Sequence, residues 1–183
     1  MDYKKIVTRF PGENELSSKE ITDIVELINK VYLTSESDFW PHNGDYQRTT
    51  IDEVTAFIIK KELLVATLKD FVVGAAHVYP VKDDICGFGM LVTSPQHRKK
   101  GIGSALIKAI ENWAMTNKYQ TIQLELLKPT TYQHPEKKFL KQWHTSLNYQ
   151  LISSTTYADL YPNQAHLLKI PCTFDVYQKN LKK

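Results

Sequence analysis

The stretch from residue 86 to residue 118 constrains the fold more than any other part of this chain. An apolar run over residues 86–93 passes through a proline turn into the loop RKKGIG, residues 98–103, and an amphipathic helix opens at once. A strand, loop and helix in this order bring unbonded backbone N–H groups and the positive end of the helix dipole to one point. The two glycines lack a Cβ, so phosphates can approach the main chain closely. The segment predicts a site for a phosphate-bearing ligand.

Two familiar phosphate-binding loops do not match this segment. A dinucleotide fingerprint would place Gly or Ala three residues after Gly103, where Leu106 stands, and a P-loop would need Gly-Lys-Ser/Thr after four spacer residues. Two other interpretations of the basic loop are a solvated turn that binds nothing and a nucleic-acid patch. The net charge of +3 is mild and most positive residues are scattered, so we expect no nucleic-acid partner.

Length and composition indicate one compact domain over residues 1–183, because 42% of the residues are hydrophobic and can bury an ample core. The only cysteines, Cys86 and Cys172, have no paired framework, which is typical of a reducing compartment. The N-terminus has no apolar core for a signal peptide, and no apolar run reaches membrane-spanning length. We expect a cytoplasmic protein without a membrane partner. The histidines and cysteines never fall at ligand spacing, so we expect no metal.

Hydrophobic periodicity predicts alternating helices and strands. Capping boxes at Ser17–Glu20 and Thr50–Glu53 open two helices, the second running to Ile59. A third helix starts at residue 102 and a fourth spans 136–147. The expected strands cover residues 63–68, 71–79, 86–93, 121–127, 149–153 and 174–178, with a tight turn at Lys69-Asp70. Hairpins combined with one strand-helix-strand crossover predict a three-layer α/β sandwich around a mixed, mostly antiparallel sheet.

The motif Arg98-x-x-Gly101-x-Gly103 resembles the Arg/Gln-x-x-Gly-x-Gly/Ala signature of the GCN5-related N-acetyltransferases, the GNAT superfamily. Its setting between a strand and a helix is also that of the family. Phe71–Ala76 (FVVGAA) is similar to the family's "vvG" segment, and Trp143–Tyr149 (WHTSLNY) to its "FYekLGF" segment. Asn148 replaces the usual Gly there, and Asn tolerates a left-handed backbone. The resemblance covers nearly the whole chain.

This resemblance implies a sheet whose fourth and fifth strands splay apart to admit acetyl-coenzyme A. The pantetheine arm would pair with Leu91, Val92 and Thr93. The pyrophosphate would lie on Arg98, Lys99, Lys100, Gly101, Ile102, Gly103 and Ser104. The implied activity is transfer of the acetyl group from acetyl-CoA to a primary amine of a small molecule or peptide by direct attack. The alternative is a non-catalytic domain that binds or senses acyl-CoA, and a homodimer is left open.

The resemblance also implies two catalytic candidates. Glu125 matches the general base of members that acetylate protein N-termini, and desolvation beside apolar neighbours would raise its pKa. The alternative is a Glu that simply faces solvent. His144 stands where the family usually has a Tyr near the cofactor sulfur, and imidazole can also donate a proton. The alternative here is that the acid is missing and the thiolate leaves unaided. Lys137 replaces an Asn that helps bind the cofactor arm in many relatives.

The acceptor side is expected in the loop between the first two helices and in the stretch before the fourth helix. Trp40, Tyr46 and Arg48 are the predicted substrate-binding residues. Aromatic walls with one Arg suit an amine that carries a carboxylate, such as an amino acid or a peptide end. The segment Phe39-Trp40-Pro41 can equally serve to pack the loop, and polyamines, aminoglycosides and protein lysines stay open as acceptors. The same two segments also contain Asp38, His42, Asp45, Tyr132 and His134.

Overall fold

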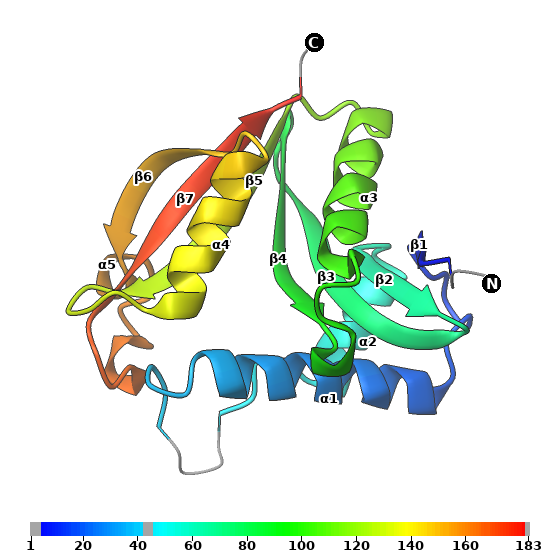
Figure 1. Cartoon of the computed structure of the whole chain (residues 1–183), viewed down its shortest axis with the longest axis horizontal. Coiled ribbons are helices and arrows are strands. Elements are labelled where there is room, and N and C mark those ends of the chain that lie inside the picture. The colour runs from blue at the N-terminus through cyan, green and yellow to red at the C-terminus, as the bar shows by residue number, and fades with distance from the viewer. Residues whose placement is uncertain (1–4, 42–45, 182–183) are drawn as a thin grey trace.

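The computed structural model describes residues 5–41 and 46–181. Its elements are β1 (Val7–Arg9), α1 (Ser18–Ser35), α2 (Ile51–Ile59), β2 (Leu63–Leu68), β3 (Phe71–Lys82), β4 (Ile85–Thr93), a 3-10 turn (Pro95–His97), α3 (Ile102–Thr116), β5 (Thr121–Pro129), α4 (Pro135–Ser146), β6 (Gln150–Thr156), α5 (Tyr157–Leu160), a second 3-10 turn (Ala165–Leu167) and β7 (Cys172–Asn180) (Figure 1).

These strands form one sheet in the order β1-β2-β3-β4-β5-β7-β6. Every pairing is antiparallel except that of β4 with β5, which is parallel and short. It runs from Ile85↔Thr121 to Phe88↔Leu124, and beyond it the two strands diverge toward the bottom of Figure 1. The predicted mixed, mostly antiparallel sheet with a splayed central pair is therefore confirmed.

The helices cover both faces of this sheet. On β2, Leu64 and Ala66 pack in the cluster that contains α3, while Leu63 and Val65 pack in the cluster that contains α1 and α2. Successive side chains of a strand point to opposite faces, so the sequence of a strand that is buried on both sides is a continuous run of apolar residues. This explains the apolar run LLVA at residues 63–66, and it gives the three layers expected from the sequence.

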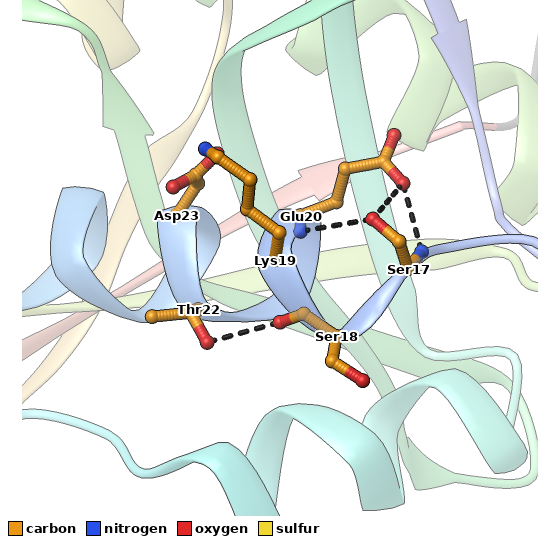
Figure 2. A network of polar contacts seen from close by, with 6 residues as sticks. All are labelled: Ser17, Ser18, Lys19, Glu20, Thr22 and Asp23. Atoms are coloured by element: carbon orange, nitrogen blue, oxygen red, sulfur yellow. Dashed lines mark hydrogen bonds and ion pairs between the residues drawn. The ribbon is translucent and has the colours of Figure 1, made fainter.

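Side-chain caps fix where the first two helices begin. Ser17 accepts a hydrogen bond from the Glu20 N–H at 3.3 Å, and Glu20 accepts one from the Ser17 N–H at 2.8 Å (Figure 2). One turn further on, the Thr22 hydroxyl donates to the Ser18 carbonyl. Thr50 caps α2 by accepting a hydrogen bond from the Glu53 N–H, but the predicted capping box is not completed, because the Glu53 carboxylate accepts from the Thr49 hydroxyl instead. Each cap satisfies a backbone donor that has no partner inside the helix.

Gly74 allows α3 to approach the sheet closely. A Cβ at Gly74 would lie 2.9 Å from Ile102 Cγ2 and 3.1 Å from Leu106 Cδ1. The glycine of the FVVGAA segment therefore has a packing reason, since it seats the first turn of α3 against β3. The Lys69-Asp70 turn has φ of 51° and 66°, and Asn148 has φ of 68°, as the sequence patterns predicted.

Some elements are longer than predicted or were not predicted. α1 continues to Ser35, and β6 and β7 extend beyond residues 153 and 178. β1 and α5 were missed. Most of β6 is exposed at the edge of the sheet, so its sequence carries no alternation of apolar and polar residues. Among the described residues no helix has both the length and the hydropathy to cross a membrane.

Candidate active site

A large cleft opens where β4 and β5 part, with a volume of about 1790 Å³. Ligand pockets are usually about 300–1000 Å³, so this cleft has room for a long ligand and a second molecule together. One end is lined by the free part of β4, the loop before α3 and the start of α4. The other end is lined by α1, residues 46–48 and 50, Phe57 of α2, and His77 and Tyr79 on β3.

The loop before α3 presents its backbone N–H groups to the first of these ends. The His97 N–H bonds to the Ser94 carbonyl at 2.8 Å and the Ala105 N–H to the Gly101 carbonyl at 2.9 Å. Between them, the N–H groups of residues 99–104 donate no hydrogen bond to any described residue. Gly101 has φ of 81°, and a Cβ there would meet nothing within 4 Å. The loop therefore fits a pyrophosphate.

The predicted cofactor residues lie mostly on this cleft. Arg98, Lys99, Gly101, Ile102, Gly103 and Ser104 line it, as do Leu91, Val92 and Thr93, whereas Lys100 is exposed and does not. Gly103 is a glycine for a different reason from Gly101. A Cβ at Gly103 would lie 3.2 Å from the Trp143 ring of α4, so Gly103 lets α3 and α4 approach one another. Arg98 forms an ion pair with Glu136 at 3.7 Å.

The backbone of β4 has an unpaired edge in the cleft. Beyond Phe88, β4 pairs only with β3, through Gly89↔His77, Val92↔Ala75 and Thr93↔Gly74. The register shifts between the first two of these pairs, where Met90 has φ of 47°, and this is a β-bulge. An extended ligand can pair with such an edge as an added strand.

Glu125 is the first residue of β5 beyond the last pair with β4. Its side chain is exposed, and the space it faces is the cleft. Gln178 donates to Gln123 at 2.8 Å, and Gln123 donates to Glu125 at 3.4 Å, which orients the carboxylate. Burial raises the pKa of Tyr79 to about 12, with a further increase from Glu125 and a decrease from Arg48. Tyr79 thus lies within electrostatic reach of both charges.

His144 lies in the core beneath β4. It is buried against the rings of Phe88, Trp143 and Tyr149, and it is not among the residues that line the cleft. Burial lowers its pKa to about 4, and Nδ1 makes no hydrogen bond. At neutral pH the ring is uncharged. The acid role of His144 stays a prediction that this placement does not support.

The predicted acceptor residues line the second end of the cleft. Trp40 stacks on Tyr46, with ring centroids 4.7 Å apart, and the Arg48 guanidinium lies 5.1 Å from the centroid of Tyr32. Phe39 is instead fully buried, so part of the loop does serve packing. Asp38, Tyr132 and His134 do not line the cleft, and His42 and Asp45 lie outside the described residues. In the described ranges no three His, Cys, Asp or Glu side chains are grouped to hold a metal ion.

A sequence profile of the acetyltransferase (GNAT) family matches residues 22–144. The chain belongs to the GNAT family. Solved structures share its fold at low identity. They include an aminoglycoside 6'-N-acetyltransferase complexed with coenzyme A (TM-score 0.70, 15% identity, 98% of each chain covered). A second is yncA, a putative acetyltransferase from Salmonella typhimurium, with its cofactor acetyl-CoA (TM-score 0.67, 15% identity, 97% of this chain and 95% of that chain covered). A third is Ard1 from Thermoplasma volcanium (TM-score 0.66, 14% identity, 97% of this chain and 99% of that chain covered). Comparison with curated protein sequences finds no match.

Lys137, which the resemblance aligns with an Asn of many relatives, has a structural role in this chain. Its ammonium group is buried and binds Glu36 at 2.5 Å, and the other Glu36 oxygen accepts from the Trp40 indole at 3.0 Å. This pair connects the end of α1 to the start of α4. Sequence reasoning missed it because the two residues are 101 positions apart.

Sequence reasoning also missed five cleft residues on the β3–β4 hairpin: His77, Tyr79, Phe88, Gly89 and Met90. A signal was present in the alternation of His77 and Tyr79, which places both rings on one face. Gly87 pairs with Tyr79, and a Cβ at Gly87 would lie 2.8 Å from the Tyr79 ring. Gly87 thus leaves room for that ring to lie across the strand.

Proposed function

We propose that this GNAT protein transfers the acetyl group of acetyl-CoA to the primary amine of a small molecule or peptide by direct attack. The observation that carries the proposal is the meeting of two features in one cleft. Unbonded backbone N–H groups at residues 99–104 suit the pyrophosphate, and the Glu125 carboxylate lies where β4 and β5 part. The cleft volume accommodates donor and acceptor together.

The chain's own groups suit the steps of such a reaction. A protonated amine is not a nucleophile, and Glu125 can accept its proton directly or through water. The thioester carbonyl supplies the electrophile, and a backbone N–H on the unpaired edge of β4 can stabilise the oxyanion that develops there. Because His144 does not line the cleft, we propose that the coenzyme A thiolate leaves without a proton from it.

A second candidate function, acyl-CoA binding without turnover, is favoured by one observation. The position at which the family usually places an acid holds a buried, uncharged His144. Such a domain would use the same loop and the same β4 edge but would release no thiol.

Free thiol release, measured with acetyl-CoA and a panel of primary amines, peptides and matched alcohols, tests the proposal. We expect thiol release and an acetylated amine, seen as a gain of one acetyl group by mass spectrometry. Release with the alcohols alone would assign O-acetylation instead. A thermal shift with acetyl-CoA but no thiol release from any compound would establish the binding domain.

A further inference from the structure

Arg48 is a cation in the cleft that has no acidic partner among residues 5–41 and 46–181. No described carboxylate lies within ion-pairing distance of its guanidinium, which is partly buried beside Tyr32. Burial raises the pKa of Tyr32, so this neighbour is a neutral phenol at pH 7 and does not neutralise the charge. An uncompensated charge removed from water is costly, and an anionic ligand would relieve that cost.

Two of the other three lysines and arginines that line the cleft among the described residues have carboxylate partners. Lys137 binds Glu36, and Arg98 binds Glu136. The third, Lys99, belongs to the loop before α3. His77 contacts Glu62 at 3.0 Å but is not a cation at pH 7, because burial lowers its pKa. Glu36 is also within electrostatic reach of Arg48, but its two oxygens are taken by Lys137 and Trp40.

The backbone at Arg48 is held firmly. The Arg48 and Thr49 N–H groups donate to Asn29 Oδ1 at 2.7 and 3.0 Å, and Asn29 Nδ2 donates to the Thr49 carbonyl at 3.0 Å. One α1 side chain thus fixes the residue from which the guanidinium projects. Preorganisation of this kind reduces the entropy that a ligand contact costs.

An opposite charge lies in the same cleft. Glu125 has a hydrogen bond from Gln123 but no cationic partner among the described residues, and Tyr79 lies within reach of both Glu125 and Arg48. The stacked pairs Trp40–Tyr46 and Phe57–His77 provide aromatic walls on the side of Arg48. Such walls exclude water and strengthen contacts between charges.

We propose that the acceptor is a small primary amine that also carries a carboxylate, with the carboxylate bound by Arg48 and the amine directed to Glu125. This inference rests on the proposed function and specifies its substrate class. A guanidinium matches a carboxylate by two parallel hydrogen bonds, which a neutral amide cannot reproduce. The cleft therefore selects amino acids and related amino-carboxylic acids over amines without an acid group.

The test compares L-amino acids with their matching carboxamides, using free thiol release. We expect wild type to favour the acid by roughly tenfold or more in kcat/KM. Arg48→Gln should bring this ratio close to one while the Kd for acetyl-CoA stays within about twofold, and Arg48→Lys should keep part of the preference. Arg9→Gln, which removes an exposed arginine paired with Glu15, serves as the matched control.

A second readout does not need turnover. Calorimetric titration of coenzyme A-saturated protein with the same acids and amides should show acid-selective binding in wild type, lost in Arg48→Gln. Equal use of acid and amide by wild type, or a preference that survives Arg48→Gln, would overturn the inference. If no amine releases thiol, the transfer function fails, and the titration still decides whether Arg48 holds a carboxylate.

Discussion

Gly89 and Glu125 occupy equivalent places on two diverging strands. Each directly follows the last β4–β5 pair, Phe88↔Leu124, and both line the cleft. Gly89 pairs with His77 on β3, so its missing side chain would point to the face where the acceptor end of the cleft lies. A Cβ on Gly89 would meet nothing within 4 Å. The absent side chain therefore leaves open the space in front of Glu125.

Gly89→Val should close this space without disturbing the fold. We expect kcat/KM for the amine to fall by about tenfold or more, because a side chain of this size occupies part of the acceptor space. The Kd for acetyl-CoA should change little. Steady-state kinetics with both substrates and a melting curve check this. Gly87→Val is the contrasting variant, since its side chain would strike the Tyr79 ring and lower the melting temperature.

Glu125→Gln tests the general base. We expect kcat/KM to fall by about a hundredfold, since the amide cannot accept the proton. Acetyl-CoA binding should persist. Glu53→Gln removes a different carboxylate from the same cleft and should cost much less. Equal losses in the two variants would remove Glu125 from the mechanism.

Gly101→Val tests the phosphate loop. A residue with a side chain is strained at φ of 81° by about 1–3 kcal/mol, and relaxation would misalign the N–H groups that follow. The coenzyme A-induced thermal shift should be lost, whereas the Gly12→Ala control should retain it. With acetyl-pantetheine, a donor that lacks the pyrophosphate, the variant and wild type should react alike. A full shift in Gly101→Val would locate the cofactor elsewhere.

Glu136→Gln should tighten coenzyme A binding. Glu136 holds Arg98 and adds a negative charge close to the proposed pyrophosphate site. Both side chains are about half exposed, so we expect only a two- to threefold decrease in Kd. Isothermal titration at low and high salt measures it, and the gain should shrink as salt screens the charges. Weaker binding would mean that Glu136 holds Arg98 in its productive position.

His144→Leu separates a structural histidine from a catalytic one. The folded pKa of about 4 lies below the unfolded value of about 6.5, so the neutral ring stabilises the fold fully above pH 6.5. As pH falls through 6.5 toward 4, the unfolded chain takes up a proton that the folded chain excludes. Wild type should then lose about 3 kcal/mol that the variant does not lose.

Urea unfolding of both proteins across this pH range measures that loss, and kcat of His144→Leu should stay within a few-fold of wild type. A collapse of kcat with no change in the pH dependence of stability would restore the acid role.

Local signals explain why much of the fold was predictable. The capping box at Ser17, the side-chain cap at Thr50 and the left-handed Asn148 depend on a few adjacent residues. β1 was missed because none of its three residues is buried, and β6 was predicted only over residues 149–153 because most of it is exposed and shows no apolar pattern. The expected cytoplasmic location and the homodimer left open stay predictions.

The candidate site was predictable only in part, because it combines one continuous segment with distant residues. The phosphate loop is read directly from residues 98–104. The acceptor end brings together Arg48, Tyr79 and Glu125, whose proximity depends on strand register and on the Asn29 clamp. The resemblance aligned His144 with an acid. The environment of His144 depends on its packing beneath Phe88, and the spacing of residues in the sequence does not predict this contact.

The sheet has two arms, β1–β4 and β5–β7–β6, which are connected at both of their ends. At one end they share the short β4–β5 pairing, and at the other, where the arms lie apart, α1 passes beneath them (Figure 1). There Glu36 binds Lys137, and Phe39 is buried against Leu127 of the opposite arm. Contacts at both ends oppose a hinge-like opening of the two arms. We therefore expect the donor to enter the cleft lengthwise, without a large change in the distance between the arms.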